Sequence, residues 1–470
     1  MTTRPLDRRG GAGRPAAPVR LLHLGLGNFF RAHQAWYTDQ APDAEAWGYA
    51  AFSGRSGALA AALEEQDGLY TLITRSRQGD RFSVVGSVSR AHPAGDHQTW
   101  LRYFRHPDLA AVTVTVTEAG YLRAPDGGAD LSRRDVQADV AALRRDRTAP
   151  VSTAPGRLLA GLLARRAADG GPLALVPCDN LPSNGPALGA VLRRMANVVE
   201  PGCEEWMSGN VSVVTTVVDR ITPRTGAGDA RLVAGATGWA DACPVVAEPF
   251  HEWVLSGDFP AGRPQWEGAG ARVVDDPAPF ENRKLWLLNG AHSLLAYAGG
   301  ILGHATVPAA AADPDCRAWV QDWWAVAAPH LRQPPGEVAG YLEALLERFS
   351  NDRMGDRLER IAEDGSQKLP VRVLPVLRAE RAAGRLPVGA CRVVSAWICH
   401  LRGLGVPVRD ARAAEVVPLA AGAMGPAVQR VLAWLGADLA ADPDLRAAVA
   451  EQCAEMTGRH RSRPGPAGGR

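Results

Sequence analysis

The stretch VRLLHLGLGNFFRAHQ (residues 19–34) determines which fold the first half of the chain is expected to adopt. Its apolar start predicts a strand over 19–24, and a helix is expected over 31–40. Gly25 and Gly27 lie between the two and supply the first two glycines of the G-x-G-x-x-G turn. Two glycines let the backbone approach a pyrophosphate, whose charge the start of the following helix can meet. The stretch therefore predicts a dinucleotide-binding unit.

The rest of this loop departs from the usual pattern. Phe30 occupies the third glycine position and Arg31 follows it, and both are counted with the two glycines among the expected cofactor-binding residues. The alternative is a structural turn in which Arg31 is a surface charge. An acidic residue after the second strand usually binds the adenosine ribose, but residues 53–56 read SGRS. NAD is the expected cofactor, with NADP left open, because Arg55 either approaches a 2′-phosphate or is an exposed loop arginine.

Short β-rich runs alternate with helical patterns through the first half of the chain. The runs are 47–53, 69–74, 82–88, 111–121, 173–180 and 211–220, and the helices are 156–169 and 185–199. This alternation predicts an α/β fold with a Rossmann-type, doubly wound parallel sheet, to which the second and third runs add antiparallel strands. Ligands bind beyond the carboxyl ends of such strands. The polar residues that end the runs are expected to point toward one crevice: Glu118, which is counted as cofactor-binding, and Asp179, Asn180 and Asp219.

The pattern changes in the second half, where β-rich runs become scarce and Ala/Leu/Arg-rich helical segments dominate. We therefore expect a Rossmann-type dinucleotide-binding domain over 18–275 and a mostly α-helical substrate and catalytic domain over 276–458. The tails 1–17 and 459–470 are rich in Gly, Pro and Arg and poor in apolar residues, which predicts disorder.

Composition narrows the class of protein. The net charge of +2 with 22% charged residues gives no field for nucleic acid or a membrane surface. No secretory signal and no run of about 18 apolar residues is visible, so a cytoplasmic protein without a membrane span is expected. The seven cysteines are scattered, with no CxxC and no Cys/His cluster at zinc-ligand spacing. We expect buried thiols in a reducing compartment and no metal.

A second constellation lies in ENRKLWLLNGAHS (281–293), which contains Lys284, Asn289 and His292. On an α-helix at about 100° per residue these three lie at roughly 0°, 140° and 80°, within one arc. Together they suit alcohol oxidation. A desolvated lysine can take the hydroxyl proton as general base, an asparagine can donate to the oxygen, and a histidine can bind a neighbouring hydroxyl. The alternative is the polar face of an amphipathic helix.

Six motifs, in chain order, resemble the mannitol dehydrogenase family. They are GNFFRAHQ (27–34), VTEAGY (116–121), CDNLPSNG (178–185), VVDRITP (217–223), EPFHEWV (248–254) and KLWLLNGAHS (284–293). The resemblance covers about residues 20–400. It implies a metal-free, polyol-specific long-chain dehydrogenase with a Rossmann-type N-terminal domain, a helical C-terminal domain and the active site between them.

The resemblance also implies roles for single residues. Lys284 would be the catalytic base, and Asn180 and Asn289 would flank the reacting oxygen as an oxyanion hole. His292 would orient the substrate and Asp219 would bind a substrate hydroxyl. The remaining positions are substrate contacts or lie on a proton route: Arg360 and Lys368 for the substrate, and Glu281 near the proton exit. Plainer alternatives are a buried Asp219–Arg220 ion pair, a turn role for Asn180 and a surface charge at Arg360.

The expected function is NAD(P)-dependent interconversion of a sugar alcohol and its ketose, of the mannitol and fructose kind. The alternatives in the same fold are reduction of a keto-uronate such as fructuronate and a mannitol-1-phosphate 5-dehydrogenase activity. Extra Arg or Lys in the pocket would favour these anionic substrates, because guanidinium binds carboxylate and phosphate bidentately. A non-catalytic, cofactor-sensing protein is the remaining class. The expected partner is a small polyol or keto-sugar, with no nucleic acid and no membrane, and the expected state is a monomer.

Overall fold

The computed structural model describes residues 3–54 and 56–462 and divides into two compact units, Met1–Pro277 and Ala278–Arg470. A six-stranded sheet is the centre of the first unit, and every pair of neighbours in it is parallel. Its strands, in spatial order, are β6 (Val88–His92), β3 (Gly48–Phe52), β2 (Val19–Leu24), β7 (Ala111–Val114), β8 (Leu173–Pro177) and β9 (Val211–Val213). The α/β prediction with a doubly wound parallel sheet is confirmed.

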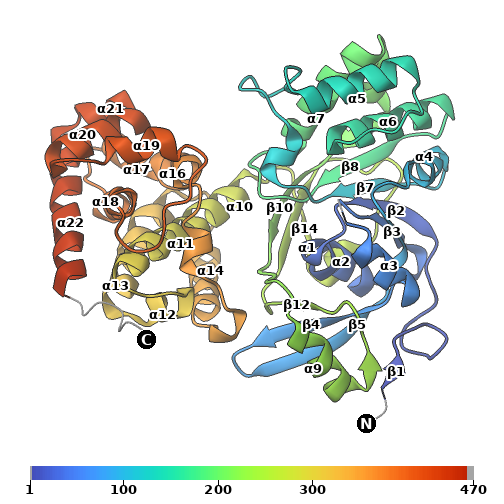
Figure 1. Cartoon of the computed structure of the whole chain (residues 1–470), viewed down its shortest axis with the longest axis horizontal. Helices are drawn as coiled ribbons and strands as arrows, with labels where there is room; N and C mark the ends of the chain where they lie inside the picture. The colour runs from blue at the N-terminus through green and yellow to red at the C-terminus, as the bar shows by residue number, and fades with distance from the viewer. Residues whose placement is uncertain (1–2, 55, 463–470) are drawn as a thin grey trace. The chain divides into compact units, whose positions relative to one another are not determined.

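Helices cover both faces of this sheet (Figure 1). Leu22 and Leu24 of β2 pack on one face and Leu21 on the other, because successive strand residues point to opposite sides. The first face carries α4 (His97–Arg105), α5 (Arg134–Arg145), α6 (Ala154–Ala167) and α7 (Asn184–Val199). The second carries α1 (Asn28–Ala32), α2 (Gln34–Gln40) and α3 (Ala58–Glu65). Because helices cover both faces, ligands can reach the sheet only at the ends of its strands.

The predicted antiparallel extension is present, but its second run is divided between two sheets. β4 (Tyr70–Ser76) pairs antiparallel with β5 (Gly79–Val85) and parallel with β12 (Val245–Ala247). The run 82–88 ends at Val85, and β6 of the main sheet begins at Val88. The break has a hydrogen-bonding cause. Gly86 N donates to Asp39 Oδ1 at 2.8 Å and Ser87 Oγ donates to Ala35 O at 2.6 Å, so both residues bond to α2.

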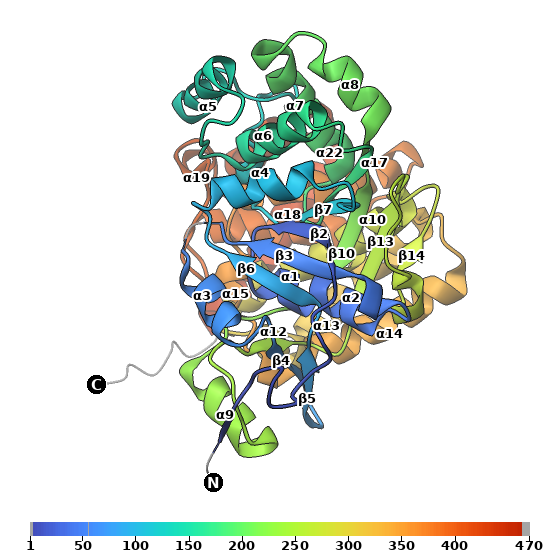
Figure 2. The ribbon, with the colours of Figure 1, turned by 90° about the vertical axis from the view of Figure 1, so that its right-hand side faces the viewer.

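The run 211–220 is also divided, which corrects its assignment to one parallel strand. Val214 N still donates to Leu175 O at 2.9 Å, and the chain then leaves the main sheet. β10 (Thr215–Asp219) pairs antiparallel with β13 (Glu252–Ser256), as Figure 2 shows, and β14 (Arg272–Val273) completes this second sheet. Asp219 therefore ends a strand of a different sheet from the one that carries Asn180.

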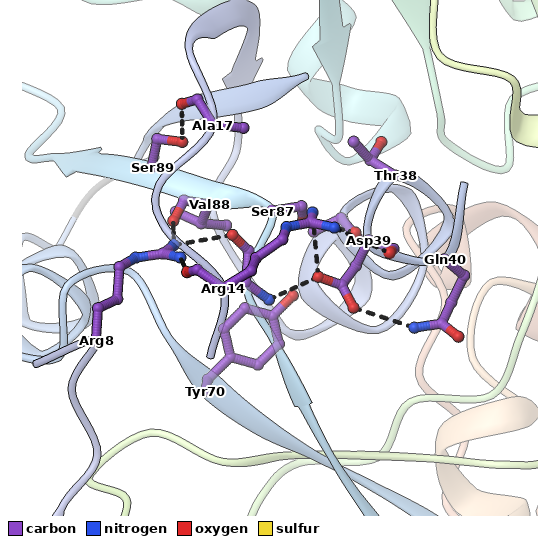
Figure 3. A network of polar contacts seen from close by, with 12 residues as sticks. Arg8, Arg14, Ala17, Thr38, Asp39, Gln40, Tyr70, Ser87, Val88 and Ser89 are labelled. Atoms are coloured by element: carbon purple, nitrogen blue, oxygen red, sulfur yellow. Dashed lines mark hydrogen bonds and ion pairs between the residues drawn. The ribbon is translucent and has the colours of Figure 1, made fainter. Parts of the chain in front are cut away.

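From residue 3 onward the N-terminal segment is bonded to the rest of the first unit, although the sequence predicts a disordered tail over 1–17. Arg8 holds it in place, with Nη2 donating to Gly86 O at 2.8 Å and to Val88 O at 3.1 Å (Figure 3). Arg14 pairs with Asp39 at 3.3 Å, and Leu6 is buried. Arginines that satisfy main-chain carbonyls fix a segment that its Gly/Pro-rich composition alone would leave loose.

The second unit is helical, as predicted. It begins with α10 (Ala278–Arg283), the π-helical turn η4 (Lys284–Gly290), α11 (Ala291–Leu294) and the π-helical turn η5 (Leu295–Gly299). Its longer helices are α13 (Pro314–Ala327), α14 (Pro335–Phe349), α18 (Val388–Leu401) and α22 (Pro443–Ser462). α22 runs past the predicted start of the C-terminal tail, because Arg459 donates to Glu455 at 3.1 Å and pairs with Asp315. In the described residues of both units, no helix is long and apolar enough to cross a membrane.

Two buried histidines make the stability of the fold pH-dependent. Burial lowers the pKa of His23 and of His33 to about 3. An unfolded histidine titrates near 6.5, so below that pH the unfolded chain binds protons that the folded protein does not. The stability that the neutral rings confer is complete above about pH 6.5 and is lost as the pH falls toward 3.

We expect His33→Asn, which removes the titrating ring, to make the free energy of unfolding depend less steeply on pH between pH 4 and 6.5. The slope should fall by up to about 1.4 kcal/mol per pH unit, the effect of one suppressed titration. Denaturant unfolding across this pH range measures it. The matched control is His106→Asn, since His106 is exposed. Equal slopes for the two variants would contradict the assignment.

Candidate functional site

The two glycines of the loop between β2 and α1 have different structural roles. Gly25 has φ +113°, and a Cβ there would lie 2.0 Å from Thr115 O, so the fold itself requires glycine. Gly27 has an extended backbone with φ −156°, and a Cβ there would meet only Gly25 O, at 3.5 Å, within 4 Å. Gly27 thus leaves open the space that a pyrophosphate would need.

Phe30 and Arg31, which the sequence predicts to bind the cofactor, both lie on the core side of the loop. Phe30 is fully buried, and its ring stacks on His23 with centroids 3.6 Å apart. Arg31 is buried as well; its guanidinium donates to Asn28 Oδ1 at 2.8 Å and to Cys243 O, and burial lowers its pKa. Both residues fix the loop from the core side, so Arg31 is not a surface charge. The third glycine position is thus filled by a core side chain.

The adenosine side of the loop is only partly described. Arg55 lies outside the described residues. Next to it, Ser53 N donates to His92 O at 2.9 Å, and the buried Arg157 donates through Nη1 to Ser53 O at 3.4 Å. The pKa of Arg157 falls to about 10 because of its burial. The cationic Arg157 bonds the residue that follows β3, and residues 53–57 contain no acidic side chain. The choice between NAD and NADP therefore stays open.

Glu118 does not end a strand. β7 stops at Val114, where its neighbours β2 and β8 also stop, and Pro177 at the end of β8 has no N–H to offer. The chain then turns, with Gly120 N donating to Thr117 O at 2.7 Å, and Glu118 begins the short 3₁₀ turn η2 (Glu118–Tyr121) as an exposed residue. The Val/Thr alternation predicted a strand longer than the one observed, because the length of a strand depends on its partner strands more than on residue propensity.

Asn180 follows β8 as predicted, and sequence reasoning missed the side chain that fixes its loop. The Tyr121 hydroxyl donates to Asp179 Oδ2, and Leu181 N donates to Asp179 Oδ1 at 3.1 Å. Burial and the Asp179 carboxylate raise the pKa of Tyr121, which keeps this hydroxyl protonated as a donor. These bonds fix Asp179 and Leu181, the two neighbours of the exposed Asn180. The motifs VTEAGY and CDNLPSNG therefore form one structural unit.

A second missed residue, Asn184, connects the segments that carry Asn180 and Asp219. It is fully buried, and its Nδ2 donates to Pro177 O at 3.2 Å and to Thr216 O at 3.1 Å. Its Oδ1 accepts from Thr216 N at 3.0 Å. An asparagine seven residues after a strand gives no sequence signal of its own, because its hydrogen bonds depend on where β10 passes.

Asp219 is buried at the end of β10, opposite Glu252 of β13. Its neighbour Arg220 donates to Ala32 O at 2.6 Å and to Glu248 O at 3.2 Å, and burial lowers its pKa to about 10. His33 Nε2 bonds Glu252 O at 2.9 Å. The motifs RAHQ and EPFHEWV therefore hold the antiparallel pair of strands that carries Asp219.

Lys284 and Asn289 both lie in η4, which is π-helical. The angles between their side chains therefore differ from those predicted for an α-helix. A π-helical turn bonds residues five apart, whereas an α-helix places such residues about 140° apart. In η4 the two side chains therefore leave from nearly the same face. Lys284 is 8% exposed and Asn289 is half-buried. An amine and an amide on one face of a turn are the groups that a base and an oxygen-binding donor would require.

The neighbouring residues extend this face. The ring of His292, in α11, lies 4.8 Å from that of Phe349 at the end of α14. Glu281 lies in α10, three residues before Lys284, and is half-buried. The proton-route assignment of Glu281 stays a prediction.

The two C-terminal substrate candidates lie near each other in the chain and differ in exposure. Arg360, in α15 (Leu358–Ile361), is exposed. Lys368, in α16 (Gly365–Arg372), is half-buried and donates through Nζ to Ile361 O at 3.2 Å. Burial raises the pKa of Asp356 to about 6, against the lowering effect of Arg348 and Arg360.

Asn180 and Asp219 belong to the first unit, and Lys284, Asn289 and His292 to the second. In the part of the chain that the structure describes, no three or more His, Cys, Asp or Glu side chains form a group that could hold a metal ion.

Comparison with known proteins gives one family for both units. Residues 19–268 match the mannitol dehydrogenase Rossmann domain, and residues 276–457 match the mannitol dehydrogenase C-terminal domain. D-arabinitol 4-dehydrogenase of Ralstonia nicotianae is 36% identical over 82% of this chain and 84% of its own. D-mannonate oxidoreductase of Escherichia coli is 34% identical over 89% of this chain and 87% of its own.

A solved structure agrees with these relatives. The ternary complex of Pseudomonas fluorescens mannitol 2-dehydrogenase with NAD and D-mannitol is 31% identical, with a TM-score of 0.81 over 95% of this chain and 94% of that one. Two domain models that together span most of the residues, and relatives above 30% identity over more than four-fifths of the chain, leave one assignment. The chain belongs to the mannitol dehydrogenase family, a family of NAD(P)-dependent polyol dehydrogenases.

Proposed function

We propose that this protein catalyses the reversible, NAD(P)-linked oxidation of a secondary alcohol of a sugar alcohol to the ketose, with Lys284 as general base. The observation that carries the proposal concerns lysine. The chain has 52 basic residues, and only Lys284 and Lys368 are lysines. Everywhere else it uses arginine, which stays protonated at all physiological pH values and cannot accept a proton. Lys284, on the same face as Asn289, is therefore a side chain that can lose its proton and act as a base.

The remaining roles follow from the donors and acceptors of each side chain. Asn289 and Asn180 each offer an amide N–H₂, which stabilises an oxygen as it becomes anionic. Lys284 takes the hydroxyl proton when its amine is neutral. Asp219 accepts a hydrogen bond from a further substrate hydroxyl, and His292 orients the substrate.

The loop fits a dinucleotide, because the space beside Gly27 is open. The loop Gly25–Asn28 would hold the pyrophosphate. NAD(P)⁺ supplies the hydride acceptor when it is bound. With no acid after β3, we propose that either cofactor is accepted.

A second candidate substrate class is an anionic one, a keto-uronate. It is favoured by Arg348 and Arg360, two guanidinium groups whose positive charges both act on Asp356. A guanidinium group can bind a substrate carboxylate bidentately.

A panel of polyols, aldonates, keto-uronates and polyol phosphates, each with NAD and NADP and followed at 340 nm, tests the proposal. We expect turnover with at least one polyol and its ketose in the reverse direction. Turnover of a uronate alone would select the second class. Cofactor binding without turnover of any member would contradict both and support a cofactor-sensing protein.

A further inference from the structure

The turn that carries Lys284 and Asn289 is bonded by side chains as well as by its own backbone. Trp323 Nε1 donates to Trp286 O at 2.8 Å, and Trp324 Nε1 donates to Leu287 O at 2.9 Å. Both indoles come from α13 and are buried. Two consecutive tryptophans thus bond two consecutive carbonyls of η4.

A third carbonyl of η4 accepts from side chains outside α13. Asn289 O accepts from Arg372 Nη1 at 3.3 Å and from Ser293 Oγ at 3.0 Å. Arg372 Nη1 also donates to Ser293 Oγ at 3.2 Å. Three of the seven residues of η4 therefore have carbonyls that accept from side chains outside it.

These bonds bear on the choice between π- and α-helical geometry. π-helical turns are rare and occur mostly as single turns inside α-helices. An indole has one N–H and no acceptor, so each of these tryptophans is committed to a single carbonyl. Return of η4 to α-helical geometry would shift Trp286 and Leu287 and break both bonds.

The packing beside the bonds is equally close. A Cβ on Gly290 would lie 2.8 Å from the ring of Trp323, so the indole sits directly on the glycine backbone. The ring of Trp324 stacks on Phe349 with centroids 6.1 Å apart, and Phe349 contacts the ring of His292. Trp324 therefore contacts η4 directly and is connected to His292 through Phe349.

We propose that Trp323 and Trp324 are positioning residues that keep η4 π-helical, so that Lys284 and Asn289 project from one face, with Arg372 fixing the end of the turn. This rests on the proposed function, because it assumes that Lys284 is the base. Without the indole N–H groups, η4 moves toward α-helical geometry and Asn289 turns away from the amine.

Trp324→Phe and Trp323→Phe test the proposal, since phenylalanine keeps an aromatic ring of smaller volume and has no N–H donor. We expect kcat for polyol oxidation to fall about 10- to 100-fold, the cost of misplacing reacting groups by about 1 Å. The pH profile of kcat should change, because the surroundings of the amine change. The Kd for the cofactor should not. Hydrogen exchange of residues 284–290 should be faster.

The matched control is Trp319→Phe. Trp319 lies on the same helix and is also buried, but its ring contacts Arg392, at 5.0 Å, and Arg459, at 5.4 Å. We expect normal kcat, normal pH profile and unchanged exchange over 284–290 for this variant. Equal losses in all three tryptophan variants, with unchanged pH profiles, would mean a merely structural role and would overturn the proposal.

Arg372→Lys keeps the test open if a tryptophan variant does not fold. It keeps the charge at a half-buried position and removes the planar fork, and the same loss of kcat and faster exchange are expected. Lys284→Ala in the same assay separates the two levels of argument. If Lys284→Ala loses activity while the tryptophan and Arg372 variants keep normal kcat and exchange, the positioning role is wrong and the proposed function stands. If Lys284→Ala stays active, the proposed base is wrong, and the inference that rests on it fails too.

Discussion

Replacing Lys284 by alanine is expected to lower the rate of polyol oxidation about 10²- to 10⁴-fold, the usual contribution of a positioned base. Hydride leaves the carbinol carbon readily only as the hydroxyl proton is removed. In the wild type, kcat for oxidation should rise with pH until the amine is neutral, and the variant should lose this limb. A small amine in solution should restore part of the rate. The Kd for the cofactor should be unchanged. Turnover against pH for both proteins measures all of this.

The scarcity of lysine makes this prediction unusually easy to control. Lys284→Arg keeps the positive charge and cannot supply a neutral amine, so it should be as inactive as the alanine variant. Lys368→Arg keeps the charge at a proposed binding position, so it should raise KM for the substrate more than it lowers kcat. Side-chain amines occur only at these two positions in the chain. The pH dependence of acetylation at Lys284, measured by mass spectrometry, therefore reports its titration with Lys368 as internal reference.

An active Lys284→Arg variant with an unchanged pH profile would show that another group takes the proton.

The sequence predicted those parts of the fold that local pattern controls. The strand at Val19–Leu24, the glycine turn and the helical second unit follow from apolar periodicity and turn chemistry, and all three are present. Motif order also predicted the family correctly. These features depend on residues that are close together in the chain.

The errors share a physical cause, which is contact between segments far apart in the sequence. Phe30 is in the core, where its ring packs on that of Tyr49 in β3 with centroids 5.0 Å apart, and β7 ends where its partner strands end. The angles in 284–292 were wrong because tryptophans almost 40 residues later bond the carbonyls of η4. No local pattern records such bonds, so the residue types of the candidate site were predictable and their relative directions were not.

The loop between β2 and α1 gives the second large effect. Gly27→Val should weaken cofactor binding about 10- to 100-fold, which corresponds to about 1.4–2.8 kcal/mol. The backbone of Gly27 is extended, with φ −156°, which valine adopts without strain, and the space around its Cβ is open in the folded protein. The valine side chain would fill the volume that the pyrophosphate needs, so the protein should fold and bind the cofactor poorly. Titration of NADH and NADPH fluorescence gives Kd, and a thermal melt gives the stability.

Two further glycines separate this effect from general damage. Gly209→Val makes the same change in α8 (Cys203–Asn210), where the space for a Cβ is also open, and should leave Kd unchanged. Gly25→Ala should act on folding instead, because φ is +113° and the added Cβ would overlap Thr115 O at 2.0 Å. A cofactor loop predicts a lower Tm for Gly25→Ala. It predicts a normal Tm and a raised Kd for Gly27→Val. If Gly27→Val binds both dinucleotides as tightly as Gly209→Val does, the pyrophosphate lies elsewhere, and the first two glycines of the motif serve only to turn the chain from β2 into α1.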